Sequence, residues 1–181
     1  MAALVLGHRA GGGVEAPDLV GAATAGQSAQ LIVALVEQPY RVASRRSPAP
    51  AGQLDAAWIA VISQLREDLL RGLPLVAGGR SAGARVACRT AEEIGAAAVL
   101  CLAFPVHPPG RPEKSRLSEL DSVRVPTLVV QGESDPFGMP PEGPNRTVVP
   151  IPGTHSLRSS AAVAEAVSGW LETVVPVSVE P

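Results

Sequence analysis

The segment Leu75-Val76-Ala77-Gly78-Gly79-Arg80-Ser81-Ala82-Gly83-Ala84-Arg85-Val86-Ala87 decides the fold of this chain. It joins an apolar run, typical of a buried strand, to an alanine-rich run that favours helix, through a turn that fits G-x-S-x-G. That pattern holds its serine out on a strained strand-to-helix turn, so Ser81 is the candidate nucleophile. Gly79 and Gly83 suit the turn because a Cβ at either position would meet neighbouring backbone. The alternative is a glycine-rich turn that happens to contain a serine.

The composition favours one domain with an aliphatic core. The chain has 181 residues, of which 46% are hydrophobic and 3% aromatic, and its formal net charge is -2. We expect a single domain over residues 1–175 and a C-terminal tail over 176–181. The charge gives no electrostatic footprint for nucleic acid or anionic lipid. With no apolar run of the ~18 residues that a membrane span needs and no signal segment, the sequence predicts a cytoplasmic protein without nucleic-acid or membrane partners.

The cysteines and histidines do not indicate a metal site. Cys88 falls in the helical run and Cys101 in an apolar run, so both are expected to be small buried hydrophobic residues rather than a disulfide or a metal-binding pair. The three histidines are scattered, without the spacing of paired metal ligands. We therefore expect no metal and no cofactor.

Short apolar or β-branched runs alternate with helical patterns along the chain. The expected strands are 4–6, 31–36, 75–77, 97–104, 127–130 and 145–151, and the expected helices are a weak one over 22–33, a strong one over 54–69, one after the serine turn that ends at Gly95, and one over 163–174. This alternation predicts an α/β fold: a doubly wound, mainly parallel sheet of about six strands with helices on both faces.

A polar, basic loop is expected over residues 37–46, before a proline-rich stretch. Its arginines, Arg41, Arg45 and Arg46, could bind a substrate anion. A solvated surface cluster, or one that ties loops together, is the favoured interpretation.

Chemistry-bearing residues follow the predicted strands. The carboxyl ends of parallel strands share one edge, which would gather the loop 8–13, Ser81, Asp135 and His155. A serine needs a base to take its proton and an acid group to orient that base, and the order Ser81, Asp135, His155 supplies both. Glu133 is the competitor for the acid, and an ordinary loop histidine is the alternative for His155.

The loop over residues 8–13 is rich in glycine but does not favour nucleotide binding. It has no Gly-Lys-Ser/Thr ending, and Arg9 stands where a G-x-G-x-x-G pattern starting at Gly7 needs glycine. The other use of such a loop is to supply one N–H of an oxyanion hole, the second coming from Ala82 at the start of a helix. His107, in a proline-rich loop, either lines a pocket or faces solvent.

At these residues the sequence resembles the α/β-hydrolase superfamily. It is most similar to the small dienelactone-hydrolase-like branch that includes the testis-expressed protein and the third subunit of the NSL chromatin complex. The resemblance implies a Ser81–His155–Asp135 triad and an oxyanion hole formed by the N–H groups of Ala82 and Ala10. Candidates for the substrate-lining residues are Arg9, Gly11, Arg80 and His107. Arg9 departs from the glycine usual in the family.

The expected reaction is acyl transfer from a small ester-like substrate, a carboxylester or a lactone, to water. Residues 136–144 are too short and proline-rich for the usual helix, and no insertion could form a lid, so a shallow, open site is expected. A hydrolase acting on a C–C or peptide bond would share the triad. The alternative from another class is a catalytically silent interaction module within a larger complex, which would bind a protein partner.

Overall fold

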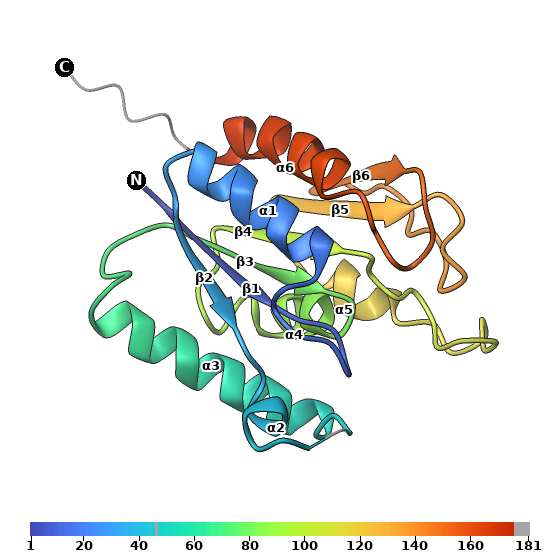
Figure 1. Cartoon of the computed structure of the whole chain (residues 1–181), viewed down its shortest axis with the longest axis horizontal. Helices are drawn as coiled ribbons and strands as arrows, with labels where there is room; N and C mark the ends of the chain where they lie inside the picture. Colours follow the sequence, from blue (N-terminus) through green and yellow to red (C-terminus); the bar gives the residue numbers. More distant parts are fainter. Residues whose placement is uncertain (46, 176–181) are drawn as a thin grey trace.

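The computed structural model describes residues 1–45 and 47–175, and its centre is a parallel sheet (Figure 1). Arg46 and the predicted tail over 176–181 lie outside the described residues. Within them the sheet has six strands in the order β2-β1-β3-β4-β5-β6, all paired in parallel. The strands are β1 Ala3–Gly7, β2 Ile32–Val36, β3 Leu75–Arg80, β4 Ala98–Leu102, β5 Thr127–Gly132 and β6 Arg146–Ile151.

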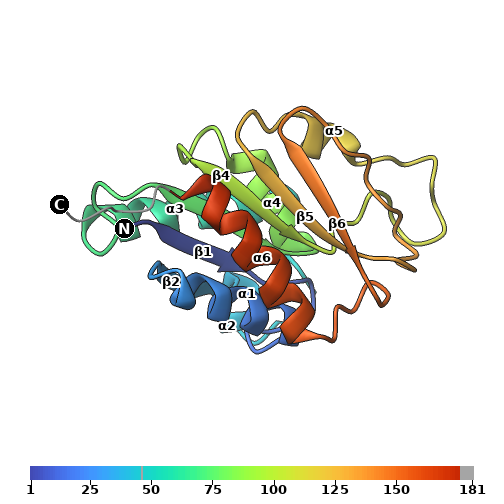
Figure 2. The same ribbon diagram turned by 90° about the horizontal axis from the view of Figure 1, so that it is seen from above.

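Helices cover both faces of this sheet, as the sequence predicts (Figure 2). On one face lie α1 Pro17–Ser28 and α6 Ser160–Val174, which pack against each other and against the sheet. The other face is covered by α2 Pro39–Val42, α3 Ala51–Glu67, α4 Ala82–Thr90 and α5 Leu117–Asp121. The fold is that of a doubly wound α/β protein.

Alternate residues of each inner strand belong to two separate hydrophobic cores, one on each face of the sheet. In β1, Leu4 and Leu6 belong to the core beneath α1 and α6, whereas Ala3 and Val5 belong to the core beneath α3 and α4. Because both faces are covered, a strand here reads as a continuous apolar run rather than an alternating one. This burial explains why the sequence pattern predicts the strands so directly.

Several helix boundaries differ from the sequence prediction. The first helix begins at Pro17, not at residue 22, because proline is well suited to the first turn of a helix. The expected loop over 37–46 contains the short helix α2. Helix α4 ends at Thr90, and Gly95 ends the turn that follows with a positive φ of 58°. The short helix α5 was not predicted.

No helix in residues 1–45 and 47–175 is long and apolar enough to cross a membrane.

Candidate active site

The turn after β3 holds Ser81 in a strained backbone conformation. Its φ is 53° and its ψ is -104°, a region that non-glycine residues rarely adopt. A Cβ on Gly79 would lie 2.8 Å from the backbone carbon of Gly83, and one on Gly83 would lie 2.6 Å from the backbone carbon of Gly7. The close approach to β1 therefore requires glycine on both sides of the serine, as the sequence predicts.

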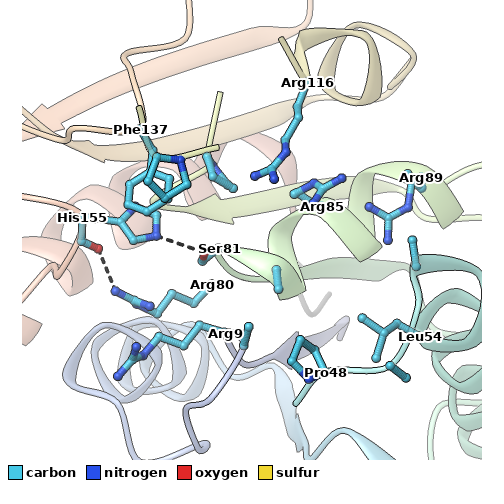
Figure 3. A pocket seen from close by; sticks show the side chains of 16 residues that line it. Arg9, Pro48, Leu54, Arg80, Ser81, Arg85, Arg89, Arg116, Phe137 and His155 are labelled. Carbon is cyan, nitrogen blue, oxygen red and sulfur yellow. Dashed lines mark hydrogen bonds between the residues drawn. The ribbon is translucent and has the colours of Figure 1, made fainter. Parts of the chain in front are cut away.

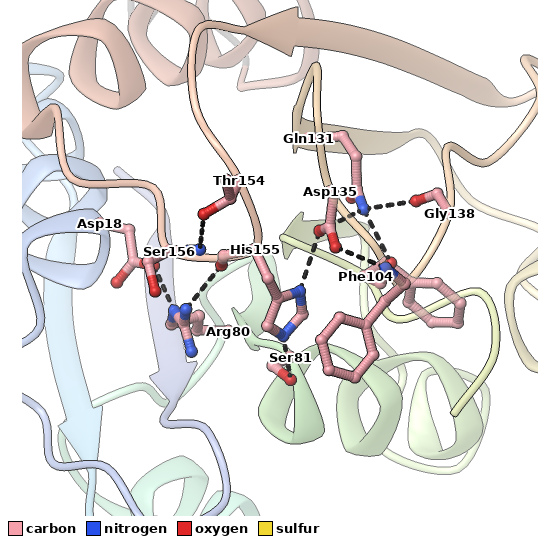
Figure 4. Close-up of polar contacts among 11 residues, drawn as sticks. Asp18, Arg80, Ser81, Phe104, Gln131, Asp135, Gly138, Thr154, His155 and Ser156 are labelled. Atoms are coloured by element: carbon pink, nitrogen blue, oxygen red, sulfur yellow. Dashed lines mark hydrogen bonds and ion pairs between the residues drawn. The ribbon is translucent and has the colours of Figure 1, made fainter. Parts of the chain in front are cut away.

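Ser81, His155 and Asp135 meet in one chain of polar contacts (Figure 4). His155 Nε2 lies 3.0 Å from Ser81 Oγ, and His155 Nδ1 lies 2.9 Å from Asp135 Oδ2. Since a carboxylate only accepts, Nδ1–H donates to Asp135 and Nε2 is left to accept the serine proton. The loops after β3, β5 and β6 thus bring Ser81 and Asp135, which are 74 and 20 positions from His155 in the sequence, together with that histidine.

The Asp135 carboxylate is fully buried and has several donors. Gln131 Nε2 donates to Oδ2 at 2.8 Å, and the Phe137 N–H donates to Oδ1 at 2.8 Å. The same Gln131 amide contacts the carbonyl oxygens of Phe104 and Gly138. Glu133, the alternative acid, is exposed. Charge-assisted bonds of this kind make a buried carboxylate tolerable and fix where its oxygens point.

The Phe137 ring packs against the imidazole of His155. The two ring centroids are 4.1 Å apart and the planes differ by 30°. This contact covers one face of the imidazole and leaves the histidine side chain 17% exposed. Phe137 was not singled out in the sequence, although its place two residues after Asp135 follows from the same loop.

A buried ion pair supports the histidine loop from beneath. Arg80 Nε donates to Asp18 Oδ2, and Arg80 Nη2 donates to the backbone oxygen of His155 at 2.7 Å. Arg80 is 3% exposed and Asp18 1%. The sequence predicts Arg80 as a substrate-lining residue, and its side chain does lie on the cavity wall. Its Nε and Nη2 donors are occupied by Asp18 and His155, a role that could not be foreseen because Asp18 is 62 positions away.

Two residues whose backbone N–H groups are unpaired in the described chain line the same cavity as Ser81. Ala82 is the first residue of α4, and Ala10 lies in the loop after β1. Among the described residues neither N–H has a hydrogen-bond acceptor. The start of a helix leaves such donors free and places the positive end of its dipole beside them.

His8 fixes the loop that carries Ala10 through hydrogen bonds of its imidazole ring. The imidazole is 1% exposed, accepts from the Gln38 N–H at 2.9 Å, and lies 2.7 Å from the Arg9 carbonyl oxygen through Nδ1. Because Nε2 accepts, Nδ1 carries the proton and donates to that oxygen. The carbonyl of Arg9 is fixed in this way, which orients the peptide that ends in the Ala10 N–H.

A cavity of about 390 Å³ opens in front of Ser81 (Figure 3). Its wall is formed by Arg9, Ala10, Pro48, Ala49, Ala51, Leu54, Arg80, Ser81, Ala82, Arg85, Arg89, Pro105, Pro109, Arg116, Phe137 and His155. Arg9, Ala10 and Arg80 are among these residues. Gly11 and His107 are not, so the expectation that they line the site is corrected.

Local hydrogen bonds explain why Gly11 and His107 do not line the cavity. Gly11 sits in a turn with φ 66°, and its N–H points to the Tyr40 hydroxyl at 3.3 Å. The backbone N–H of His107 donates to the Phe137 carbonyl oxygen, while its Nδ1 pairs with the carbonyl oxygen of Pro108. Both residues thus support loops beside the cavity rather than its wall.

The structure shows no metal-binding cluster of His, Cys, Asp and Glu in the part of the chain that it describes. Cys88 and Cys101 are both buried, as predicted, and their sulfur atoms lie 3.5 Å apart. Burial and the contact with Cys101 raise the pKa of the Cys88 thiol well above its usual range, the thiol contact being the larger cause.

The chain belongs to the alpha/beta hydrolase domain family, whose model matches residues 1–150. The match covers the serine turn and Asp135 but ends before His155. No curated protein matches the sequence.

Solved structures share the fold at low sequence identity. An alpha-beta serine hydrolase homologue from Coxiella burnetii superposes with a TM-score of 0.74 at 16% identity, covering 94% of this chain and 86% of that one. A serine hydrolase without a lid from Xanthomonas campestris gives 0.73 at 21% identity, with 97% and 84% covered. Est1E from Butyrivibrio proteoclasticus gives 0.73 at 14% identity, with 96% and 88% covered.

Proposed function

We propose that the protein is a serine hydrolase that cleaves a small ester-like substrate, a carboxylester or a lactone, through an acyl-enzyme. The observation that carries the proposal is the contact chain from Ser81 Oγ through His155 to Asp135, set on the wall of an open cavity. A serine hydroxyl is a poor nucleophile on its own, and this arrangement supplies its base and orients that base.

In the proposed reaction Ser81 Oγ attacks the substrate carbonyl carbon while its proton passes to His155 Nε2. The tetrahedral intermediate then expels the alcohol, which takes that proton, and leaves Ser81 acylated. Water attacks the acyl-enzyme, gives its proton to Nε2, and the acid departs as the proton returns to Ser81. Asp135 keeps Nδ1–H in place and stabilises the imidazolium at each stage.

The oxyanion would be held by the N–H groups of Ala82 and Ala10. Both are on the cavity wall beside Ser81, and neither is used elsewhere in the described structure. His8 holds the carbonyl oxygen of Arg9 at 2.7 Å and so fixes the peptide that carries the Ala10 N–H. This contact is to the backbone, so it does not depend on the arginine side chain that replaces the family's usual glycine. Preorganised donors of this kind are among the largest contributions to acyl-transfer catalysis.

Within the family, we propose that the chain belongs with the small dienelactone-hydrolase-like branch. The support is the Gly79-Arg80-Ser81-Ala82-Gly83 turn together with the glycine-rich loop over residues 8–13. The segment between β5 and β6, which carries no helix, departs from the pattern usual in the family. We further propose that its substrate is a small molecule. The cytoplasmic location expected from the sequence stays a prediction.

The test is intact-mass analysis after treatment with a fluorophosphonate. The reagent needs an activated serine but no knowledge of the substrate, because Ser81 Oγ displaces fluoride from phosphorus and its proton passes to His155. We expect one adduct on the native chain and none on Ser81→Ala or His155→Ala. Asp135→Asn should slow labelling by about 10²–10⁴-fold, because the neutral amide no longer stabilises the imidazolium or fixes its tautomer.

Ser156→Ala is the matched control, since Ser156 is an exposed serine next to His155 in sequence. It should label like the native chain. If the folded native chain gives no adduct and hydrolyses neither short-chain esters nor lactones, the serine is not activated and the proposal fails. The alternative, a catalytically silent interaction module, would then be tested by a search for a stoichiometric protein partner.

A further inference from the structure

The wall of the Ser81 cavity is strongly cationic. Among its lining residues are five arginines and no aspartate or glutamate: Arg9, Arg80, Arg85, Arg89 and Arg116. Side chains of one sign in a partly enclosed site raise the local concentration of ligands of the opposite sign. The question is which of these cations are already neutralised by carboxylates behind the wall.

Three of the five are paired. Arg80 is paired with Asp18. Arg85 makes two bonds to the Glu119 carboxylate, of 2.7 and 2.6 Å, and Arg89 makes two to Asp55, of 2.8 and 2.6 Å. The ion pairs of Arg85 and Arg89 connect α4 to α5 and to α3, respectively. Their charges are largely balanced, so they do not by themselves attract a ligand.

Arg9, which is exposed, and Arg116 have no hydrogen-bond or ion-pair partner for their guanidinium groups in the described chain. Of the two, only Arg116 is partly removed from water. It is half-buried at the start of α5, and its side chain reaches toward the cavity, with its guanidinium between Phe137 and Arg85 (Figure 3). Burial, and then the nearby charge of Arg85, lower its pKa below the usual range; the Glu119 carboxylate opposes this shift and Arg89 adds to it. The guanidinium therefore brings N–H donors that have no protein partner in the described chain to the cavity, beside a Glu119 carboxylate that Arg85 and Arg89 already engage.

We propose that Arg116 forms a carboxylate subsite in the Ser81 cavity, so that the substrate is an ester carrying a second, anionic group. The inference rests on the proposed serine hydrolase function and narrows its substrate class. Arginine suits this task because its planar guanidinium can bind a carboxylate through two parallel hydrogen bonds. Arg85 lies beside this subsite and is held in place by its two bonds to Glu119.

The subsite is close to the nucleophile. Arg85, whose charge acts on Arg116, is on the first turn of α4 and four residues after Ser81, which directly precedes that helix. Four residues correspond to a rise of about 6 Å in a helix. A carboxylate at Arg116 would thus be separated from the scissile carbonyl by only a few bonds. The monoester of a four- or five-carbon dicarboxylic acid has this spacing, and so does a small acyl group on a carboxylate-bearing alcohol.

The first experiment compares matched ester pairs that differ only in the negative charge. For the acyl side, mono-4-nitrophenyl glutarate is compared with 4-nitrophenyl pentanoate; each reacts with water to give the acid and 4-nitrophenol. For the alcohol side, 4-acetoxybenzoate is compared with 4-acetoxybenzamide. We expect kcat/KM to favour the anionic member of at least one pair by tenfold or more, and Arg116→Gln to remove that preference. Equal ratios in native and variant chains would overturn the subsite.

Two variants distinguish an effect of the charge at position 116 from an effect of the protein's net charge. Arg116→Lys should retain part of the preference, because it keeps the charge but loses the planar pair of donors. Arg111→Gln changes an exposed arginine in the same loop, outside the cavity wall, and should keep the native ratio. A preference lost equally in Arg111→Gln would mean long-range attraction by net charge, which contradicts a subsite.

The second experiment does not depend on turnover. Binding of glutarate, the product of the acyl-side ester, is measured by calorimetry in the native chain and in both glutamine variants. The dissociation constant should rise at least tenfold in Arg116→Gln and stay unchanged in Arg111→Gln. If the fluorophosphonate labels the chain but Arg116→Gln does not change the dissociation constant of glutarate, the subsite is rejected and the hydrolase proposal stands. Arg116-dependent glutarate binding without labelling would reject the hydrolase and retain the anion site.

Discussion

At the scale of single residues, Arg80 links three parts of the site that are far apart in sequence. It is the last residue of β3, directly before Ser81, and it joins Asp18 on α1 to the backbone of the His155 loop. The carbonyl oxygen of His155 is therefore held relative to the serine by a side chain that leaves the same strand. We expect Arg80 to act as a positioning residue, which reaches the reacting atoms through His155.

Replacing Arg80 should separate positioning from simple stabilisation. Arg80→Gln leaves Asp18 as a buried, unpaired carboxylate, a change that typically costs 3–5 kcal/mol of the free energy of unfolding. In the fraction that remains folded, the rate of fluorophosphonate labelling at Ser81 should fall about tenfold or more, because the His155 loop loses its support. Arg80→Lys keeps the ion pair but not both donors, and should give an intermediate rate.

Arg66→Gln is the control for this experiment. Arg66 also donates to a backbone oxygen, that of Gly95 at 3.0 Å, but it lies away from the cavity. It should lose some stability without any change in labelling rate under conditions where the chain is folded. An Arg80→Gln variant that labels at the native rate would show that Arg80 contributes to folding alone.

The sequence predicts the three residues of the proposed reacting centre better than it predicts the residues that hold them in place. Ser81, Asp135 and His155 could be chosen because each follows a strand of a parallel sheet, and such ends share one edge. Asp18 and Gln131 could not be chosen, because an isolated polar residue in an apolar segment gives no sign of its partner. Their roles depend on three-dimensional contacts across 62 positions and within one crowded loop, respectively.

At the scale of elements, the serine turn depends on a close approach of α4 to β1. A Cβ on Gly83 would lie 2.6 Å from the backbone carbon of Gly7 and 3.0 Å from the His8 carbonyl oxygen. Both obstacles are backbone atoms of a central strand and its loop, so they cannot move aside as a flexible side chain could. The turn, the strand and the loop that carries Ala10 therefore form one rigid unit.

Gly83→Ala should lower the free energy of unfolding by about 1–3 kcal/mol, the usual cost of forcing an extra carbon into a packed region, and should also disturb the loop of Ala10. Urea unfolding measures the first effect and fluorophosphonate labelling the second. Gly169→Ala is the matched control. Gly169 lies within α6 with open space around its Cβ position, so alanine there should stabilise the chain by roughly 0.5–1 kcal/mol. Equal effects at the two positions would contradict the steric argument.

Prediction of the elements succeeds where burial on both sides creates an unbroken apolar run, as in β1, β4 and β5. The prediction is weakest for helices in which apolar and polar residues are not separated onto opposite faces. The residues of α1 are small and weakly patterned, and the helix is set by its packing against α6, where a Cβ on Gly21 would meet the backbone of Ser160. The short helices α2 and α5 are too brief to show a period, so only tertiary contacts determine them.

At the scale of the whole molecule, the strand order places the cavity. β1 has β2 on one side and β3 on the other, so the chain turns in opposite directions from the carboxyl ends of β1 and β3. The two loops diverge there and leave room between them, which is where ligands bind in sheets of this kind. Ala10 comes from one of these loops and Ser81 from the other. The position of the site is thus a property of the topology rather than of any single loop.

The same packing seals both thiols between α4 and β4. Cys88 and Cys101 are buried with their sulfur atoms 3.5 Å apart, and the charge of Glu119 adds to the cost of a thiolate while that of Arg89 offsets it. The thiols should therefore fail to react with a disulfide reagent such as dithionitrobenzoate in the folded chain, and both should react in denaturant. Rapid reaction of either thiol in the native chain would show that α4 separates readily from the sheet.

The Cys88 thiol also makes stability depend on pH. In the unfolded chain Cys88 ionises near its ordinary pKa of about 8.5, whereas in the folded chain its pKa is raised and the thiol keeps its proton. Above that pH the unfolded state binds fewer protons, so the free energy of unfolding should fall as the pH rises and be fully present below it. Urea unfolding at pH 7.5 and pH 9.5 measures the difference, and Cys88→Ala should reduce it. The chain has one lysine and one tyrosine, so few other side chains titrate in this range. A native chain equally stable at both values would mean that the folded structure tolerates a thiolate at Cys88, which its burial beside Cys101 argues against.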